Sequence, residues 1–197
     1  MCDSPEAMGM TVRTSVESPR RWPLAATAAA MVGVVLGVFR WSAAIASPHA
    51  HWVDLDVYQR GANALLHGED LYAVSVHGLY FTYPPFGAVI FTPLSGLPEA
   101  VARWGFTGVS LACFAVAMVV VARRAGLGLP VSIAVSVAAA WSEPLSQGVV
   151  LGQVNTILMA MVLVDLLVVR RRRQGFLVGL AAGIKLVPAV FVLYFVL

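Results

Sequence analysis

Long apolar runs separated by short polar segments dominate the chain. Runs of this length can cross a hydrocarbon core of about 30 Å, because each helical residue rises about 1.5 Å. Four such runs are Pro23–Ala46, Ala102–Ala122, Val131–Val150 and Val154–Val169, and a fifth, Phe176–Leu197, reaches the last residue. The pattern predicts an all-α, polytopic transmembrane protein with about five spans.

A further apolar segment, Tyr83–Leu97, is too short to cross a bilayer untilted and contains several prolines. It therefore predicts an interfacial or re-entrant helix over residues 83–97. If this segment does not cross, three arginine clusters fall on one side of the membrane: Arg20–Arg21, Arg123–Arg124 and Arg170–Arg173. Because basic residues gather in cytoplasmic loops, this arrangement predicts that residues 47–82 face outward.

The N-terminus allows two interpretations. A basic pair precedes an apolar run that ends in a small-x-small sequence, as in a secretory signal peptide. The run is longer than the roughly 7–15 apolar residues of a signal peptide, which favours a retained membrane anchor. We therefore expect a disordered cytoplasmic tail over residues 1–21 and a transmembrane domain over residues 22–197.

Composition supports the membrane assignment. Hydrophobic residues make up 59% of the chain and charged residues 12%, with a mean hydropathy of +0.83. Soluble domains carry roughly twice that charged fraction, so the solvent must be lipid and we expect a multi-pass plasma-membrane protein. The net charge of +3 comes mostly from clustered arginines. These clusters indicate which ends of the membrane spans face the cytoplasm, and we expect no nucleic-acid partner. The two cysteines form no metal-ligand spacing, and we expect neither a metal site nor a cofactor.

The predicted outer loop 47–82 is acidic and aromatic. Asp54 and Asp56 lie two residues apart, just before a helix predicted over Val57–Leu66 and ended by Gly68. Such a pair can bind a divalent ion, or one carboxylate can act as a general base. The alternative is that acidic residues gather outside simply because lipid excludes them. A loop of about 35 residues without secondary structure is uncommon unless it is functional.

Two other polar or aromatic segments are candidate binding elements. The prolines in Tyr80–Pro85 block regular helix and can present Tyr80 and Tyr83 as an aromatic shelf for a sugar, or as an interfacial belt. Gln153 and Asn155 lie at a glycine-containing turn between two predicted spans. Their amides can bind hydroxyl groups without burying a charge, or they can join helices.

Lys185 lies inside the last apolar run, three residues before Pro188, which predicts a break in the helix nearby. A lysine at mid-membrane costs roughly 2.5–3.5 kcal/mol, so it predicts an anionic partner such as a phosphate, or a water-filled cavity. Snorkelling of its side chain to the interface is the alternative. Asp165 lies about one turn from Arg170–Arg173 and predicts a local ion pair.

Four stretches in this order resemble the polyprenol-phosphate-mannose-dependent mannosyltransferases of actinobacteria, which form glycosyltransferase family 87 with the GT-C membrane fold. They are Asp54–Tyr72, Phe81–Phe86, Gly152–Asn155 and Gly179–Pro188. The resemblance covers most of the chain from residue 50 onward. It implies a multi-span helical enzyme that transfers mannose from a lipid-phosphate donor at the outer membrane face.

The resemblance also implies roles for individual residues. The family pattern places a catalytic base four residues before a tyrosine, which here is Asp54, and Asp56 is a secondary candidate because its position varies. Lys185 would hold the donor phosphate and the aromatic shelf its sugar. The substrate-binding candidates are Tyr58, Tyr80, Tyr83, Gln153, Asn155 and Lys185. An inverting displacement would yield an α-mannoside on a glycolipid or lipoglycan acceptor without a metal.

The length of the chain bears on its activity. Members of the family run to roughly twice this length, and the last residues lie within an apolar run. We therefore expect the chain to be the N-terminal portion of such an enzyme. The alternatives are a membrane transporter or flippase, although no internal repeat is visible, and a truncated, non-catalytic remnant.

Overall fold

The computed structural model describes residues 28, 32, 35–37, 39, 52–73 and 75–196. The predicted tail 1–21 lies outside the described residues, as does most of the first predicted span Pro23–Ala46. Both assignments therefore stay predictions.

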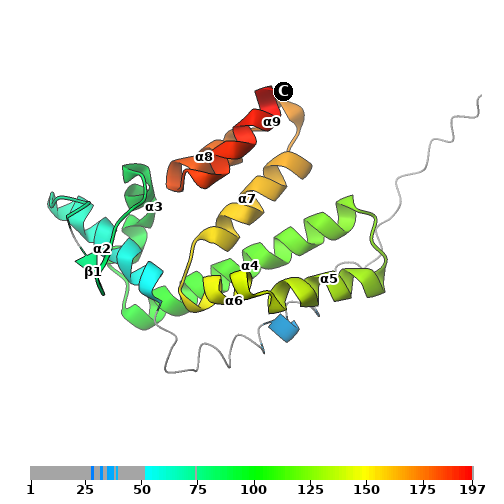
Figure 1. Cartoon of the computed structure of the whole chain (residues 1–197), viewed down its shortest axis with the longest axis horizontal. Helices are drawn as coiled ribbons and strands as arrows, with labels where there is room; N and C mark the ends of the chain where they lie inside the picture. Colours follow the sequence, from blue (N-terminus) through cyan, green and yellow to red (C-terminus); the bar gives the residue numbers. More distant parts are fainter. Residues whose placement is uncertain are drawn as a thin grey trace, which may run out of the picture.

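The described chain is mostly helical and elongated (Figure 1). A two-stranded antiparallel hairpin, which the apolar pattern did not predict, is the exception within the described part. The elements in order are α2 (Val53–His67), β1 (Ser75–Val76), β2 (Leu79–Tyr80), α3 (Pro85–Ser95), α4 (Glu99–Arg124), α5 (Leu129–Trp141), α6 (Glu143–Val150), α7 (Asn155–Leu167), the 3-10 turn η1 (Arg171–Arg173), α8 (Phe176–Ile184), the 3-10 helix η2 (Val187–Val192) and α9 (Leu193–Val196).

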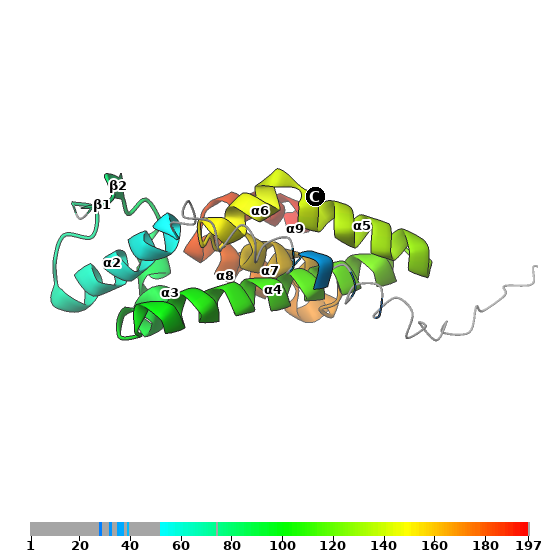
Figure 2. The same ribbon diagram turned by 90° about the horizontal axis from the view of Figure 1, so that it is seen from below.

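Helices α2 and α3 pack together at one end of the molecule, beside the hairpin (Figures 1 and 2). Helix α7 lies between α4 and α8. The core contains the fully buried rings of Tyr58 and Phe114 and the almost fully buried ring of Phe81. Gly61 of α2 lets the Phe81 ring approach its backbone, since a methyl group there would overlap that ring. Burial of these rings fixes the segment before α3 against α2.

Within the described residues, α4 is the one helix long and apolar enough to cross a membrane. It has 26 residues, which at about 1.5 Å each extend roughly 39 Å. It begins after Pro98 and ends with Arg123 and Arg124, and cations are favourable at a helix C-terminus. Helices α5 and α7 have 13 residues each. The predicted number of spans therefore remains a prediction.

Two predicted spans are not continuous helices. The run Val131–Val150 divides at Ser142, which is extended (φ −65°, ψ 139°). Pro144 explains the break, because its ring would clash with the carbonyl four residues earlier and it has no N–H to donate. The run Phe176–Leu197 divides at Lys185, which is also extended (φ −146°, ψ 132°). The predicted segment 83–97 does contain a short helix, α3.

The ion pair predicted for Asp165 is wrong. The Asp165 side chain is fully buried, and its Oδ2 accepts hydrogen bonds from the backbone N–H groups of Gly175 (3.0 Å) and Val178 (2.8 Å). These donors belong to the first turn of α8, where backbone N–H groups lack helical partners and a carboxylate is favoured. Asp165 therefore caps α8 from a neighbouring helix.

Candidate active site

The N-terminus of α2 carries both candidate acids. Helix α2 begins at Val53, four residues earlier than predicted, so Asp54 and Asp56 lie in its first turn. The backbone N–H of Trp52 donates to Val150 O (3.3 Å), and that of Asp54 donates to Leu151 O (3.0 Å). These carbonyls satisfy N–H groups that a helix start leaves free. The turn after α6 thus sets the position of Asp54.

The two carboxylates point to different sides of α2. Residues two apart on a helix are separated by about 200°, whereas residues four apart share a face. Asp56 faces His77 Nε2 (3.4 Å) and Arg103 Nη2 (3.7 Å). Asp54 shares the face of Tyr58, four residues later. Burial raises the pKa of Tyr83, and the nearby Asp54 carboxylate raises it further. Asp54 therefore lies near the tyrosine pair, and Asp56 lies in a separate ionic cluster.

Tyr58 joins three parts of the site. Its hydroxyl lies 3.0 Å from the Tyr83 hydroxyl and accepts a hydrogen bond from the Val154 backbone N–H (3.4 Å). Its ring stacks on Phe91, with centroids 4.3 Å apart. Burial, with Tyr83 beside it, raises the pKa of Tyr58 well above its ordinary value, so the hydroxyl stays protonated. Because Tyr58 is fully buried, it positions Tyr83 and the 153–155 turn instead of lining an open cavity.

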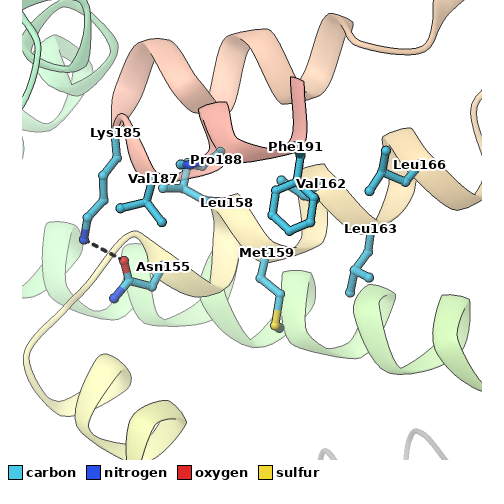
Figure 3. A pocket seen from close by; sticks show the side chains of 10 residues that line it. All are labelled: Asn155, Leu158, Met159, Val162, Leu163, Leu166, Lys185, Val187, Pro188 and Phe191. Carbon is cyan, nitrogen blue, oxygen red and sulfur yellow. Dashed lines mark hydrogen bonds between the residues drawn. The ribbon is translucent and has the colours of Figure 1, made fainter. Parts of the chain in front are cut away.

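Lys185 meets the predicted amides and the aromatic shelf. The extended residue after α8 directs its Nζ to Asn155 Oδ1 (2.9 Å), as Figure 3 shows. The Nζ also lies 5.4 Å from the centroid of the Tyr83 ring. Asn155 Nδ2 in turn donates to Gln153 Oε1 (2.6 Å). The structure thus brings together Lys185, Asn155, Gln153 and Tyr83, but not Tyr80, which is exposed on β2.

Two cavities of different character meet at Lys185. One, of about 530 Å³, is an apolar groove between α7 and η2 (Figure 3). Apart from Asn155 and Lys185, its lining is Leu158, Met159, Val162, Leu163, Leu166, Val187, Pro188 and Phe191. The other, of about 550 Å³, is lined by Tyr72, Thr82, Tyr83, Pro84, Lys185, Leu186 and Val187. A single cation therefore stands between an apolar groove and an aromatic hollow, an arrangement that suits a ligand with a lipid tail, an anionic centre and a polar head.

Pattern reasoning missed Tyr72 as a member of this site. Its hydroxyl donates to the Tyr83 carbonyl (3.2 Å), across the hairpin that separates the two residues. The residue falls within a stretch that carries the family resemblance, but nothing in its spacing indicated the contact. Among the described residues, no group of three or more His, Cys, Asp or Glu side chains is placed to hold a metal ion.

Gly152 permits the close approach of α2 to the turn that carries Gln153. Its φ is +69°, and a Cβ there would lie 2.8 Å from Leu55 Cβ and 3.2 Å from Trp52 Cδ1. Alanine thus faces both an unfavourable backbone conformation and a steric overlap at the base of the Asp54 turn.

Gly152→Ala is expected to destabilise the protein more than Gly126→Ala. Gly126 also has a positive φ (+64°), but a Cβ at that residue would meet nothing within 4 Å, so only the backbone penalty applies. That penalty is about 1–2 kcal/mol, and the overlap at Gly152 adds roughly 1–3 kcal/mol. Thermal unfolding of the two purified variants in detergent measures the difference. Equal melting temperatures would contradict the close packing of the turn on α2.

Comparisons with known proteins agree on one family. The profile of glycosyltransferase family 87 matches residues 81–197. The chain is 36% identical to the polyprenol-phosphate-mannose-dependent alpha-(1-2)-phosphatidylinositol mannoside mannosyltransferase of Mycobacterium tuberculosis, over 85% of the chain and 44% of that protein. It is 41% identical to the corresponding pentamannoside mannosyltransferase of Mycolicibacterium smegmatis, over 74% of the chain and 38% of that protein. The chain thus spans less than half the length of these relatives. No solved structure matches it significantly.

Proposed function

Because the chain belongs to glycosyltransferase family 87, we propose that it forms part of a membrane enzyme that transfers mannose from polyprenyl-phosphate-mannose to a glycolipid. The observation that carries the proposal is the position of Lys185 between the apolar groove and the aromatic hollow. The curated relatives are named for the same donor.

The three parts of this donor match the three parts of the site. The apolar groove along α7 takes the first isoprene units of the tail, as an apolar cavity favours hydrocarbon. Lys185 Nζ pairs with the phosphate, and Asn155 holds the lysine side chain in place (2.9 Å). The mannose occupies the hollow beside Tyr72 and Tyr83, whose rings offer a face for the apolar side of a sugar. In this placement, the donor phosphate is the anionic partner that the sequence predicts for Lys185.

Asp54 is the proposed catalytic base. In an inverting displacement it takes the proton of the acceptor hydroxyl while that oxygen attacks the anomeric carbon of mannose. The bond from this carbon to the phosphate oxygen breaks, and polyprenyl phosphate leaves with the electron pair, its charge stabilised by Lys185. A β-linked donor then yields an α-mannoside. Asp56 is less suited to this role, because it faces His77 and Arg103.

The names of the relatives and the arginine pattern of the sequence support a proposal for the acceptor and the location. The relatives are named for phosphatidylinositol mannosides and alpha-(1-2) transfer, so we infer an acceptor of this glycolipid class. The arginine clusters at the ends of the apolar runs support a cytoplasmic side for those ends. The site, with residues 47–82, then faces outward from the plasma membrane, and the segment that contains α3 lies at that interface without crossing. We also infer a GT-C-type arrangement of about five spans in residues 22–197.

Transfer by the full-length enzyme tests the proposal. Purified protein is incubated with radiolabelled polyprenyl-phosphate-mannose and a phosphatidylinositol mannoside, and the lipid products are separated. We expect the label in a glycolipid that is one mannose larger than the acceptor. A linkage-specific α-mannosidase should remove this labelled mannose. A nucleotide-diphosphate mannose should give no product. Transfer from the nucleotide donor alone, or donor translocation across vesicles without transfer, would overturn the proposal.

A further inference from the structure

The segment Arg170–Arg173 lies at the far end of α7 from the candidate active site. Helix α7 has 13 residues, so about 20 Å of helix separates these arginines from Asn155. All four side chains are exposed. Within the part of the chain that the structure describes, none of them has a carboxylate within 4 Å. The nearest acid in sequence is Asp165, and its carboxylate accepts hydrogen bonds from backbone N–H groups at the start of α8 instead.

The arginines are presented on an ordered turn. The backbone N–H of Arg173 donates to Arg170 O (2.8 Å), which closes the 3-10 turn η1. Gln174 Nε2 donates to Leu166 O (3.2 Å), and the Asp165 carboxylate binds the N–H of Gly175 (3.0 Å). The C-terminal end of the turn is therefore tied to the last turn of α7. Ordering of the backbone before a ligand arrives lowers the entropy lost on binding.

The surroundings of the turn are both cationic and apolar. A hollow of about 800 Å³ is lined by Val169 and Arg170–Arg173. An adjoining one, of about 560 Å³, is lined by Val169, Arg172, Arg173, Gln174, Phe176 and Leu177. The Phe176 ring is 72% exposed. A phosphate suits the guanidinium groups, which bind it through two parallel hydrogen bonds. A purely aqueous anion would leave Phe176 and Leu177 without a partner.

We propose that the turn Arg170–Arg173 is a binding site for the headgroup phosphate of an anionic phospholipid, with Phe176 and Leu177 against the start of its acyl chains. The site lies in the leaflet opposite the candidate active site. A charge bias for topology would be served equally by lysine at any place in the loop. A phosphate site on this turn favours arginine, because a guanidinium binds a phosphate through two parallel hydrogen bonds and a lysine ammonium does not. The proposal rests on the membrane placement given above but not on the transfer reaction.

Lipid retention by the full-length protein tests the site. The protein is purified from membranes in mild detergent, and native mass spectrometry measures bound cardiolipin against added phosphatidylcholine. Changing Arg171, Arg172 and Arg173 together to glutamine should lower bound cardiolipin about tenfold or more. Changing the same three to lysine keeps the charge and hence the orientation, and should lower it severalfold. Arg124→Gln, at the end of α4, is the control and should leave it unchanged.

Three results would overturn the proposal. One is a glutamine variant that retains as much cardiolipin as the unmodified protein. Another is a lysine variant that retains as much cardiolipin as the unmodified protein, which would mean that positive charge alone holds the lipid and that the turn is no specific phosphate site. The third is displacement of cardiolipin by millimolar inorganic phosphate, which would mean a site for a free anion. Because no mannosyl donor is present, failure of the transfer proposal would leave these outcomes unaffected.

Discussion

Replacing Asp54 by asparagine is expected to slow mannosyl transfer by about 10²–10⁴-fold while the protein stays folded. Asparagine keeps the size of the side chain but cannot take a proton from the acceptor hydroxyl. Its backbone N–H can still donate to Leu151 O (3.0 Å), so the start of α2 should keep its place. The fall should appear in kcat and in kcat/KM alike, because the base acts in the transition state.

Asp56→Asn is the matched control, since it removes the same charge two residues away. Its carboxylate faces His77 and Arg103, at distances of 3.4 and 3.7 Å. Pairs of this kind contribute about 1 kcal/mol or less, so we expect a small loss of stability and a rate within severalfold of the unmodified enzyme. Transfer is measured with purified full-length variants of matched melting temperature. Loss of activity in Asp56→Asn with retention in Asp54→Asn would reverse the two assignments.

The sequence could separate these acids only once the start of the helix was known. No Ser, Thr, Asp or Asn side chain caps α2, and the residue before it is Trp52 in a left-handed conformation. Instead, carbonyls of the turn after α6, about a hundred residues later in the chain, receive its first N–H groups. Local rules therefore placed the start of the helix four residues late, after both acids. A cap supplied by tertiary contact leaves no local signature.

Apolar length predicted where helices lie better than where they break. Helices α3 and α7 lie within predicted apolar segments, and α4 extends a few residues beyond both ends of the predicted run Ala102–Ala122. Pro144 marked a break that the length criterion overrode. Pro188 predicted a break near Lys185, but its presence did not indicate that the backbone becomes extended at the lysine itself, three residues earlier.

The sequence indicated several residues of the site but not the contacts between them. Lys185 was singled out because lipid makes a lysine costly, and Asn155 because an amide between two spans can bind hydroxyl groups without burying a charge. Their hydrogen bond joins residues thirty positions apart and depends on how α8 packs against α7. The approach of α3 to α8 also contributes, since a Cβ on Gly87 would lie 3.0 Å from Ile184 O. Such packing follows from the whole fold and not from any spacing along the chain.

Replacing Lys185 by glutamine is expected to lower kcat/KM for polyprenyl-phosphate-mannose by about 10²–10³-fold. Glutamine can still bond Asn155 but carries no charge to stabilise the phosphate as it leaves. If the lysine acts mainly on the leaving group, kcat should fall with little change in KM for the donor. If it acts equally on the bound donor and the transition state, KM should rise and kcat should change little.

Two further variants test whether the effect comes from the charge at residue 185 and not from the loss of any cation. Lys185→Arg keeps the charge and should recover part of the rate, although the wider guanidinium must fit between Asn155 and the Tyr83 ring, where Nζ now lies 2.9 Å from Asn155 Oδ1. Arg60→Gln removes a cation that pairs with Glu69 on the exposed side of α2, and it should leave transfer nearly unchanged. Kinetics of the purified proteins, with donor and acceptor varied separately, distinguish these cases. A Lys185→Gln enzyme with unaltered donor kinetics would show that the phosphate lies elsewhere, and the junction of the two cavities would then lose its role in donor binding.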